Sequence, residues 1–301
     1  MALFSETPWL LKVSMIKTKL DILAVTAERT YILPHQALRR AISHYTLFIP
    51  RVRAAGSDAS GLLNIVPDAS GCIVCRWEPA NFNPMLWGPT SKVVSVSNCP
   101  ALIPQFIFVE FRPCGAARLL NSPLYPLENM VTELSAVDGR LADEIKQLFD
   151  QSYCGRRIHD HFSFIEGLDK ILLKRLEGQK DFSLVSQVMD EVSRSRGALR
   201  LAGLSRSTGY SGRHISRVVS EKLGLSVKRL SRIIRINQAC RLLSEPGTSL
   251  TELAHLLNYH DQAHFIHDFK AVCGLSPGRF LDKMSDFYNE ELKMNGIMPS
   301  K

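Results

Sequence analysis

The chain has 301 residues, 45% of them hydrophobic, so it can bury a sizeable core and we expect two domains. Its formal net charge is +8, and this charge is not spread evenly along the chain. No apolar run approaches membrane-spanning length, and lysines interrupt the N-terminal apolar residues, so we expect neither a transmembrane segment nor a signal peptide. Seven scattered cysteines, an odd number, favour a reducing cytoplasm over a disulfide framework.

The N-terminal half has the texture of a β-rich domain. Residues 1–30 show no regular pattern and are treated as an uncertain N-terminal extension, with Met15 as an alternative start. From residue 31 to about 130, short apolar runs alternate with Pro, Gly, Asn and Asp, which is typical of strands and turns. We predict strands at 62–66, 72–77, 92–96 and 106–111, and helices at 115–120, 138–151 and 160–177. Residues 31–178 therefore form a β-rich, barrel-like domain with C-terminal helices, followed by a short linker at 177–181.

A helix-turn-helix pattern begins the C-terminal half, after an amphipathic helix predicted at 181–196. Ser211 is a good N-cap, and Ile215, Val219 and Leu223 then recur at helical spacing as one apolar face. Gly224 ends this helix, since glycine readily adopts positive φ. A shorter helix just upstream closes at Gly209. Two short helices joined by a tight glycine-containing turn predict a helix-turn-helix motif.

The same pattern occurs a second time. His214, Ile215, Val219 and Gly224 recur fifty positions later as His264, Phe265, Phe269 and Gly274. Upstream of the turn the offset is forty-nine, and Asn258, which tolerates a left-handed conformation, stands where the first copy has Gly209. A long helix at 227–243 joins the copies. We expect Ser249 with Glu252 to form a capping box, Asp261 to cap the second recognition helix, and a last helix at 278–290 to precede a tail at 291–301.

The positive charge is concentrated on the first motif and the linking helix. Residues 194–241 contain twelve Lys or Arg and one acid, Glu221, so this window carries +11 and the remainder about −3. A basic segment alone is usually a solvated face, but one that lies across a helix-turn-helix is better interpreted as a phosphate-binding surface.

Residues 183–285 resemble the DNA-binding domain of the AraC/XylS family of transcriptional regulators. The resemblance rests on GYSGRHISRVVSEKLGLS, on RLSRIIRINQACRLL and, most specifically, on SLTELAHLLNYHDQAHFIHDFKAVCGLSPGRF. IVPDASGCIV and FRPCGAARLL are similar, more weakly, to the β-rich sensor domain of some members. Val219 departs from the phenylalanine common in the family, but it still fills a core position. The resemblance implies that residues 181–290 are a DNA-binding domain and that the N-terminal domain senses a ligand, dimerises, or both.

Residues near the N-terminus of a recognition helix reach base edges in the major groove. In the first motif these are Arg213, Ser216 and Arg217. In the second motif the matching positions offer one amide, apolar groups and a histidine, with one lysine better placed for phosphate: Gln262, Ala263, Ile266, His267 and Lys270. We expect the first motif to carry more of the specificity and charge.

Other groups of cysteines and histidines give weaker indications of a functional site. Cys72 and Cys75 form a C-x-x-C in the same domain as Cys99 and Cys114, so a zinc-thiolate site that acts in alkyl transfer or redox sensing is an alternative. Residues three apart in a strand face opposite sides, which favours four small core residues. Four histidines between 255 and 267 are better explained by packing than by metal. With no nucleophile motif or glycine-rich phosphate loop, we predict no enzyme activity, metal or cofactor.

The sequence thus predicts an α+β protein: a β-rich, barrel-like sensor domain with flanking helices, then an all-α domain of two helix-turn-helix motifs joined by a long helix. The expected partner is double-stranded DNA. RNA polymerase, a small-molecule effector and a second copy of the chain are possible partners, and no membrane is expected. The sequence does not distinguish activation from repression.

Overall fold

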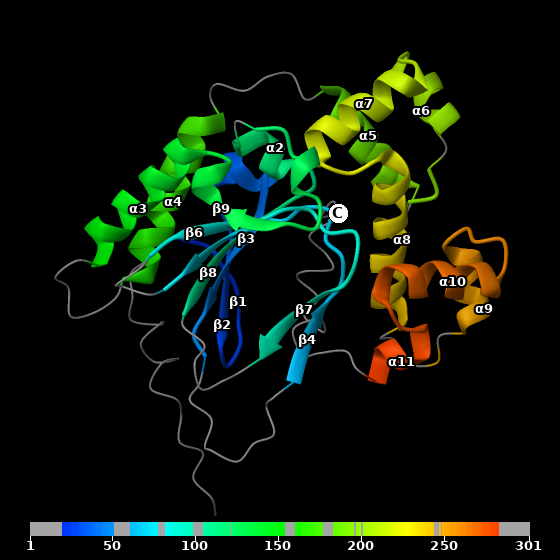
Figure 1. Cartoon of the computed structure of the whole chain (residues 1–301), viewed down its shortest axis with the longest axis horizontal. Coiled ribbons are helices and arrows are strands. Elements are labelled where there is room, and N and C mark those ends of the chain that lie inside the picture. The colour runs from blue at the N-terminus through cyan, green and yellow to red at the C-terminus, as the bar shows by residue number, and fades with distance from the viewer. Residues whose placement is uncertain are drawn as a thin grey trace, which may run out of the picture.

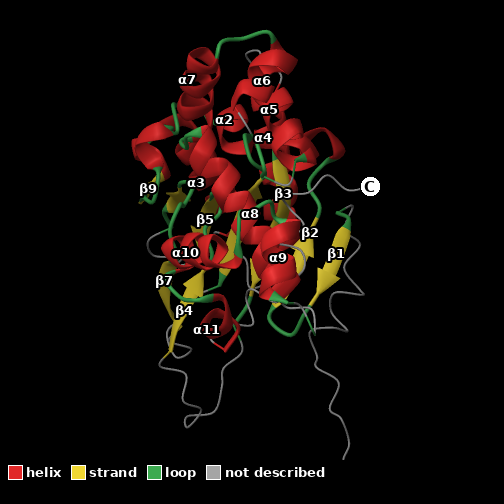
Figure 2. Cartoon of the chain, turned by 90° about the vertical axis from the view of Figure 1, so that its right-hand side faces the viewer, coloured by secondary structure: helices red, strands yellow, loops and turns green. Residues whose placement is uncertain are grey.

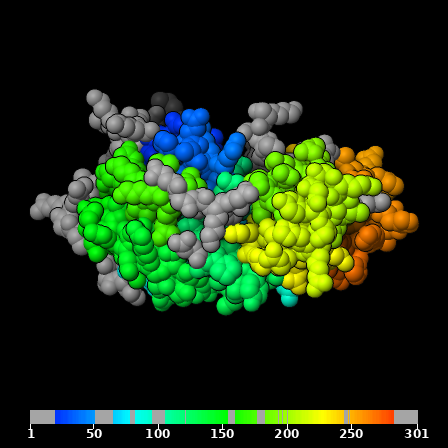
Figure 3. Space-filling view, turned by 90° about the horizontal axis from the view of Figure 1, so that it is seen from above, coloured from blue at the N-terminus to red at the C-terminus, as the bar shows by residue number. Residues whose placement is uncertain are grey.

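The computed structural model describes residues 20–50, 61–77, 82–98, 105–120, 122–153, 160–176, 183–195, 197–199, 201–243, 247 and 249–282. A sheet-containing N-terminal part and a helical C-terminal part lie side by side along the long axis of the molecule (Figures 1 and 3). Helices α3 and α4 cover the side of the main sheet that faces away from the C-terminal part (Figure 1). The two-stranded sheet lies between the main sheet and the C-terminal helices.

The main sheet has seven strands in the order β1-β2-β3-β8-β5-β6-β9, and each neighbouring pair is antiparallel. Its strands are β1 (Ile22–Val25), β2 (Arg29–Ile32), β3 (Ile42–Phe48), β5 (Cys72–Arg76), β6 (Pro84–Trp87), β8 (Phe106–Phe111) and β9 (Val131–Glu133). Strands β4 (Gly61–Ile65) and β7 (Val94–Asn98) pair separately as an antiparallel ribbon. The helices of this half are η1 (Gln36–Arg40), α2 (Gly115–Leu119), η3 (Tyr125–Leu127), η4 (Leu134–Ala136), α3 (Gly139–Tyr153) and α4 (His161–Leu176).

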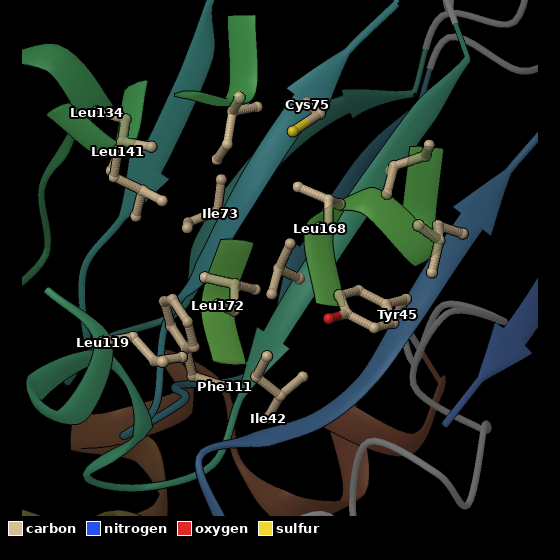
Figure 4. Packing of buried hydrophobic residues seen from close by; sticks show 14 of the residues in the cluster. Ile42, Tyr45, Ile73, Cys75, Phe111, Leu119, Leu134, Leu141, Leu168 and Leu172 are labelled. Atoms are coloured by element: carbon tan, nitrogen blue, oxygen red, sulfur yellow. The ribbon is translucent and has the colours of Figure 1, made fainter. Parts of the chain in front are cut away.

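The N-terminal core lies between the main sheet and helix α4. Tyr45, Ile73 and Cys75 point from the strands toward Leu168 and Leu172 of the helix (Figure 4). The alternate residues of β3 are also buried, although they are polar: His44 is 2% exposed and Thr46 is 3% exposed. Strand β3 is therefore buried on both faces, which hides the alternation that marks a half-buried strand.

A buried ion pair ties α4 to the start of α3. The guanidinium of Arg175 donates hydrogen bonds to both carboxylate oxygens of Asp138, at 2.6 and 3.1 Å. The same carboxylate accepts the backbone N–H of Leu141 at 3.0 Å, as an N-terminal cap does, and Arg175 also reaches the carbonyl of Leu119 at 3.2 Å. The Asp138 side chain is 4% exposed and the Arg175 side chain 12%. Three helices therefore meet at one guanidinium.

The C-terminal helices build two hydrophobic cores, one for each motif. In Figure 2 these helices lie in an upper and a lower group. They are α5 (Ser183–Arg194), α6 (Leu201–Thr208), α7 (Gly212–Leu223), α8 (Val227–Leu243), α9 (Leu250–Leu256), α10 (Gln262–Cys273) and α11 (Pro277–Asp282). The α8 bounds coincide with the predicted linking helix. No helix of the described segments is long and apolar enough to cross a bilayer.

Most predicted elements are present, and the structure differs from the predictions at the start of the sheet, in several strands and at one helix cap. The sheet begins at Ile22, ahead of the predicted boundary at residue 30, and strands β1, β2, β3, β6 and β9 were not predicted. Ser249 precedes α9, but its side chain makes no capping hydrogen bond, so the predicted capping box is wrong in that respect. The last helix is described only as far as Asp282. The linker at 177–181 and the tail at 291–301 lie outside the described residues.

Replacing Arg175 with Met should destabilise the N-terminal domain strongly. The substitution keeps much of the side-chain volume but leaves the buried Asp138 carboxylate without its countercharge, which costs about 3–5 kcal/mol. The free energy of unfolding in urea measures the effect, with Arg140→Met, on the exposed surface of α3, as the control. Equal stabilities of the two variants would contradict the assignment.

Candidate nucleic-acid interface

Each recognition helix has a side-chain cap at its N-terminus and a glycine at its C-terminus. The Ser211 hydroxyl accepts a hydrogen bond from the backbone N–H of His214 at 3.3 Å. The Asp261 carboxylate accepts one from the backbone N–H of His264 at 2.7 Å. This bond holds the pKa of Asp261 below its usual range. Gly224 and Gly274 end the two helices, both with φ of +72°. The matching caps show that α7 and α10 are two copies of one motif.

The turns before the recognition helices also correspond. Gly209 has φ of +75° and Asn258 has φ of +59°, so each adopts the left-handed conformation expected from the sequence. Tyr210 stacks on His214 in the first motif, with the ring centroids 4.9 Å apart. In the second motif Tyr259 meets His264 edge-on at 5.2 Å. The histidine of each motif therefore packs on the preceding tyrosine.

Helix α8 belongs to both cores. Its N-terminal half contributes Leu230, Ile233 and Ile234 to the core of α5, α6 and α7. Its C-terminal half contributes residues to the core of α9, α10 and α11, namely Ile236, Ala239, Cys240 and Leu243. One continuous helix therefore fixes the position of each motif relative to the other.

The three residues predicted for base contact in the first motif lie on one stretch of α7. Arg213 and Arg217 are exposed, and Ser216 is half-buried. Arg217 forms an ion pair with Glu221 one turn later, at 3.0 Å, with both side chains about half exposed. An exposed pair of this kind contributes less than about 1 kcal/mol, so Arg217 can exchange Glu221 for another partner at little cost.

The second set of predicted residues is less uniform. Ala263, His267 and Lys270 are exposed on α10. Gln262 is half-buried, and its side-chain oxygen accepts the Thr251 hydroxyl at 2.7 Å. Ile266 packs against the second core, so only part of its side chain faces solvent.

Sequence reasoning missed a charged cluster that joins α10 to α8. Asp268 forms an ion pair with Arg232 at 2.6 Å and accepts a hydrogen bond from the Tyr259 hydroxyl at 2.9 Å, and the Arg235 guanidinium lies 3.9 Å from it. The Arg235 guanidinium also lies 4.6 Å from the centroid of the Tyr259 ring. The first copy has Val218 where the second has Asp268, so comparing the repeats position by position could have revealed it.

The N-terminal half contacts both motifs directly. The Leu124 N–H donates to the Glu221 carbonyl at 3.3 Å, near the end of α7. The Val93 N–H donates to the Val272 carbonyl at 3.3 Å, near the end of α10. Three more contacts involve side chains: Arg118 with Ser186 at 2.8 Å, Asn237 with the Pro67 carbonyl at 3.1 Å, and Glu128 with Arg229.

The cysteines of the proposed thiolate site do not converge in the described segments. Cys75 points into the N-terminal core, whereas Cys114 packs against the first motif of the C-terminal half. Burial raises the pKa of each thiol to about 12, so both remain protonated at neutral pH. Within those segments no three His, Cys, Asp or Glu side chains gather as a metal site, and Cys99 lies outside them.

With this geometry in place, residues 204–283 match the helix-turn-helix domain family. They form an AraC-type helix-turn-helix domain. The HTH-type transcriptional regulator GlxA of Rhizobium meliloti is 33% identical over 75 residues, which are 25% of this chain and 23% of GlxA. The uncharacterized HTH-type regulator YfiF of Bacillus subtilis is 32% identical over 88 residues, 29% of this chain and 28% of YfiF.

The chain spans only about a quarter of the length of either relative. Both relatives are named as transcriptional regulators, a non-enzymatic class. The crystal structure of apo ToxT from Vibrio cholerae covers 80% of this chain and 98% of its own, at 12% identity and a TM-score of 0.39.

Replacing Asp268 with Val, the residue of the first copy, should destabilise the second motif. Two arginines would lose their carboxylate and the buried Tyr259 hydroxyl its acceptor, a loss of about 3 kcal/mol. Urea unfolding followed by circular dichroism measures the loss, with Asp282→Val at the exposed end of α11 as the control. A variant as stable as the parent would show that the cluster makes no net contribution.

Proposed function

We propose that the chain is a sequence-specific regulator of transcription that places α7 and α10 in successive major grooves of double-stranded DNA. The observation that carries the proposal is the pair of recognition helices with corresponding N-terminal and C-terminal caps, both packed on α8. Grooves on one face of B-DNA recur roughly every 34 Å, and a rigid pair of helices can require the DNA to bend between them.

The first motif carries most of the base recognition in this proposal. Arg213 and Arg217 are exposed on α7, and an arginine can hold a guanine through two hydrogen bonds, worth roughly 1–3 kcal/mol of discrimination. Ser216 can accept or donate beside them. In the second motif, Gln262 pairs with adenine, Ala263 and Ile266 contact thymine methyl groups, His267 reaches a base edge, and Lys270 binds phosphate.

We also propose that the N-terminal domain controls DNA binding, through an effector, through dimerisation, or through both. Its contacts with the ends of α7 and α10 support this proposal. A shift of residues 124–128 or of Val93 would displace the recognition helix that each contacts. RNA polymerase is a further proposed partner. The zinc-thiolate alternative has no support from the protonated, separated thiols of Cys75 and Cys114.

Binding of the full-length chain to fragments of its own genome tests the proposal, at near-physiological salt and with excess random DNA. Recovery of one or a few discrete fragments is expected. Retention only at low salt, with no fragment preferred, would mean that the basic surface binds phosphate without reading sequence.

Arg217→Ala should weaken binding to the selected fragment by roughly tenfold to a hundredfold and binding to random DNA far less, because the lost contact is to a base. Titration of both DNAs with the same protein preparation gives the two ratios. Lys270→Ala is the internal comparison, since a phosphate contact should cost both DNAs equally. An equal loss on both DNAs with Arg217→Ala would show that this arginine touches only phosphate.

Glu128→Gln should strengthen binding to DNA of any sequence several-fold. It removes the carboxylate that now neutralises Arg229 and takes one negative charge from beside the basic surface. The salt dependence of binding should become steeper at the same time. Glu133→Gln, in β9, makes the same change in net charge and is the control. Identical affinities of the two variants would remove Glu128 from the proposed control.

A further inference from the structure

A cavity of about 530 Å³ lies between the two motifs of the AraC-type domain, against the first half of α8. The loop before α6 forms one wall, through Gly197, Ala198 and Leu199. Ser216 of α7 and Asn258, in the turn of the second motif, also line it. The cavity thus touches a predicted base-contact residue of one motif and the turn of the other.

The polar side chains that line this cavity are hydroxyls, one amide and two cations, all of which can donate hydrogen bonds. Two of its lining residues, Lys228 and Arg235, are cations, and none is an acid. Ser226 and Val227 also line it, which brings the first turn of the 17-residue helix α8 to the cavity wall. The backbone N–H groups of a first helical turn attract anions.

One buried group in the wall has no partner among the residues described. Ser231 is 5% exposed, lines the cavity, and its hydroxyl makes no hydrogen bond there. The Nε of Arg235, another lining residue, is likewise buried without a hydrogen bond, although its guanidinium approaches Asp268 at 3.9 Å. Leaving such a donor unpaired is costly, so an acceptor that enters the cavity would be stabilised.

We propose that this cavity binds a phosphate group, held by the Ser231 hydroxyl, the Arg235 and Lys228 cations and the first turn of α8. A phosphate oxygen accepts several hydrogen bonds at once and carries the charge that this donor set favours. The backbone phosphate of bound DNA and a free phosphate-bearing molecule would use the same contacts. The DNA source rests on the function proposed above, whereas the free source does not.

The position between the motifs favours the DNA backbone. A duplex that lies against both recognition helices presents a strand of phosphates between its two major-groove contacts, and Ser216 and Asn258 mark the two sides of the cavity. A phosphate bound there would fix the register of the duplex without reading sequence.

Ser231→Ala tests the site in the full-length chain. Among the residues that the structure describes, this buried hydroxyl has no partner to lose, so the thermal midpoint should stay the same or rise. DNA affinity should fall about tenfold, by the same factor on the selected and the random fragment, because a hydrogen bond to a charged phosphate is lost. Lys228→Gln should reduce the slope of log affinity against log salt by about 1. The matched control is Arg279→Gln, which removes the same charge from the exposed surface of α11 outside the cavity and should leave the slope unchanged.

Inorganic phosphate distinguishes the two sources. Thermal unfolding of the parent and of Ser231→Ala is compared in phosphate and in chloride at equal ionic strength, without DNA. Loss of DNA affinity in Ser231→Ala supports the backbone source. Unchanged DNA affinity, with phosphate stabilising the parent but not the variant, supports a free phosphate ligand. If Ser231→Ala has the same DNA affinity as the parent and is stabilised by phosphate to the same extent, the proposal is overturned.

Failure of the proposed function gives a different result. A parent chain that binds no DNA at low salt would contradict the regulator assignment, and the phosphate titration would then decide the cavity alone. A fall in DNA affinity that Arg279→Gln reproduces in full would overturn the site in favour of a general charge effect.

Discussion

The rigidity of α8 is the constraint on which the rest of the DNA-binding half depends. Seventeen residues at about 1.5 Å each make a rod roughly 25 Å long, and both ends are buried in hydrophobic cores. A helix that packs on two sides cannot rotate or slide without breaking one core. The two recognition helices are consequently held at one separation and one angle.

The same rod explains where the charges are. The apolar positions of α8 serve two cores, and its arginines occupy the remaining surface, where Arg229 and Arg232 already have carboxylate partners. Arg232 and Arg235 converge on Asp268, so the charged cluster joins the rod to α10 as the hydrophobic core does. The N-terminal domain attaches at the ends of α7 and α10, and at Gly224 a side chain would collide with the Leu124 carbonyl, 2.7 Å from its first carbon.

Much of this half could be predicted from the sequence because its signals are local. Caps, turns and apolar spacing depend on neighbours within a few residues, so Ser211, Asn258 and Asp261 could be placed from the repeat alone. The capping box at Ser249 failed because a favourable residue type at a helix start does not ensure that its side chain bonds there.

Features that depend on residues distant in the sequence could not be predicted from the sequence. Strand β3 carries buried His44 and Thr46 on one face and Tyr45 and Leu47 on the other, so its pattern is that of neither a half-buried nor an apolar strand. The Asp268 cluster and the contact between Glu128 and Arg229 join residues distant in sequence, and charge alone does not select partners. The cavity beside Ser231 exists only once the two motifs are assembled on α8.

The spacing of the two DNA contacts tests the account most directly. A site selected by the full-length chain would be rebuilt with one to five base pairs inserted between its two contacted segments, and the affinity for each would be measured against random DNA. A rigid α8 predicts that one spacing binds best and that an insertion of about half a helical turn reduces binding to the level of a single motif. Equal affinity at every spacing would contradict the account, because it would mean that the two motifs bind independently of the helix that joins them.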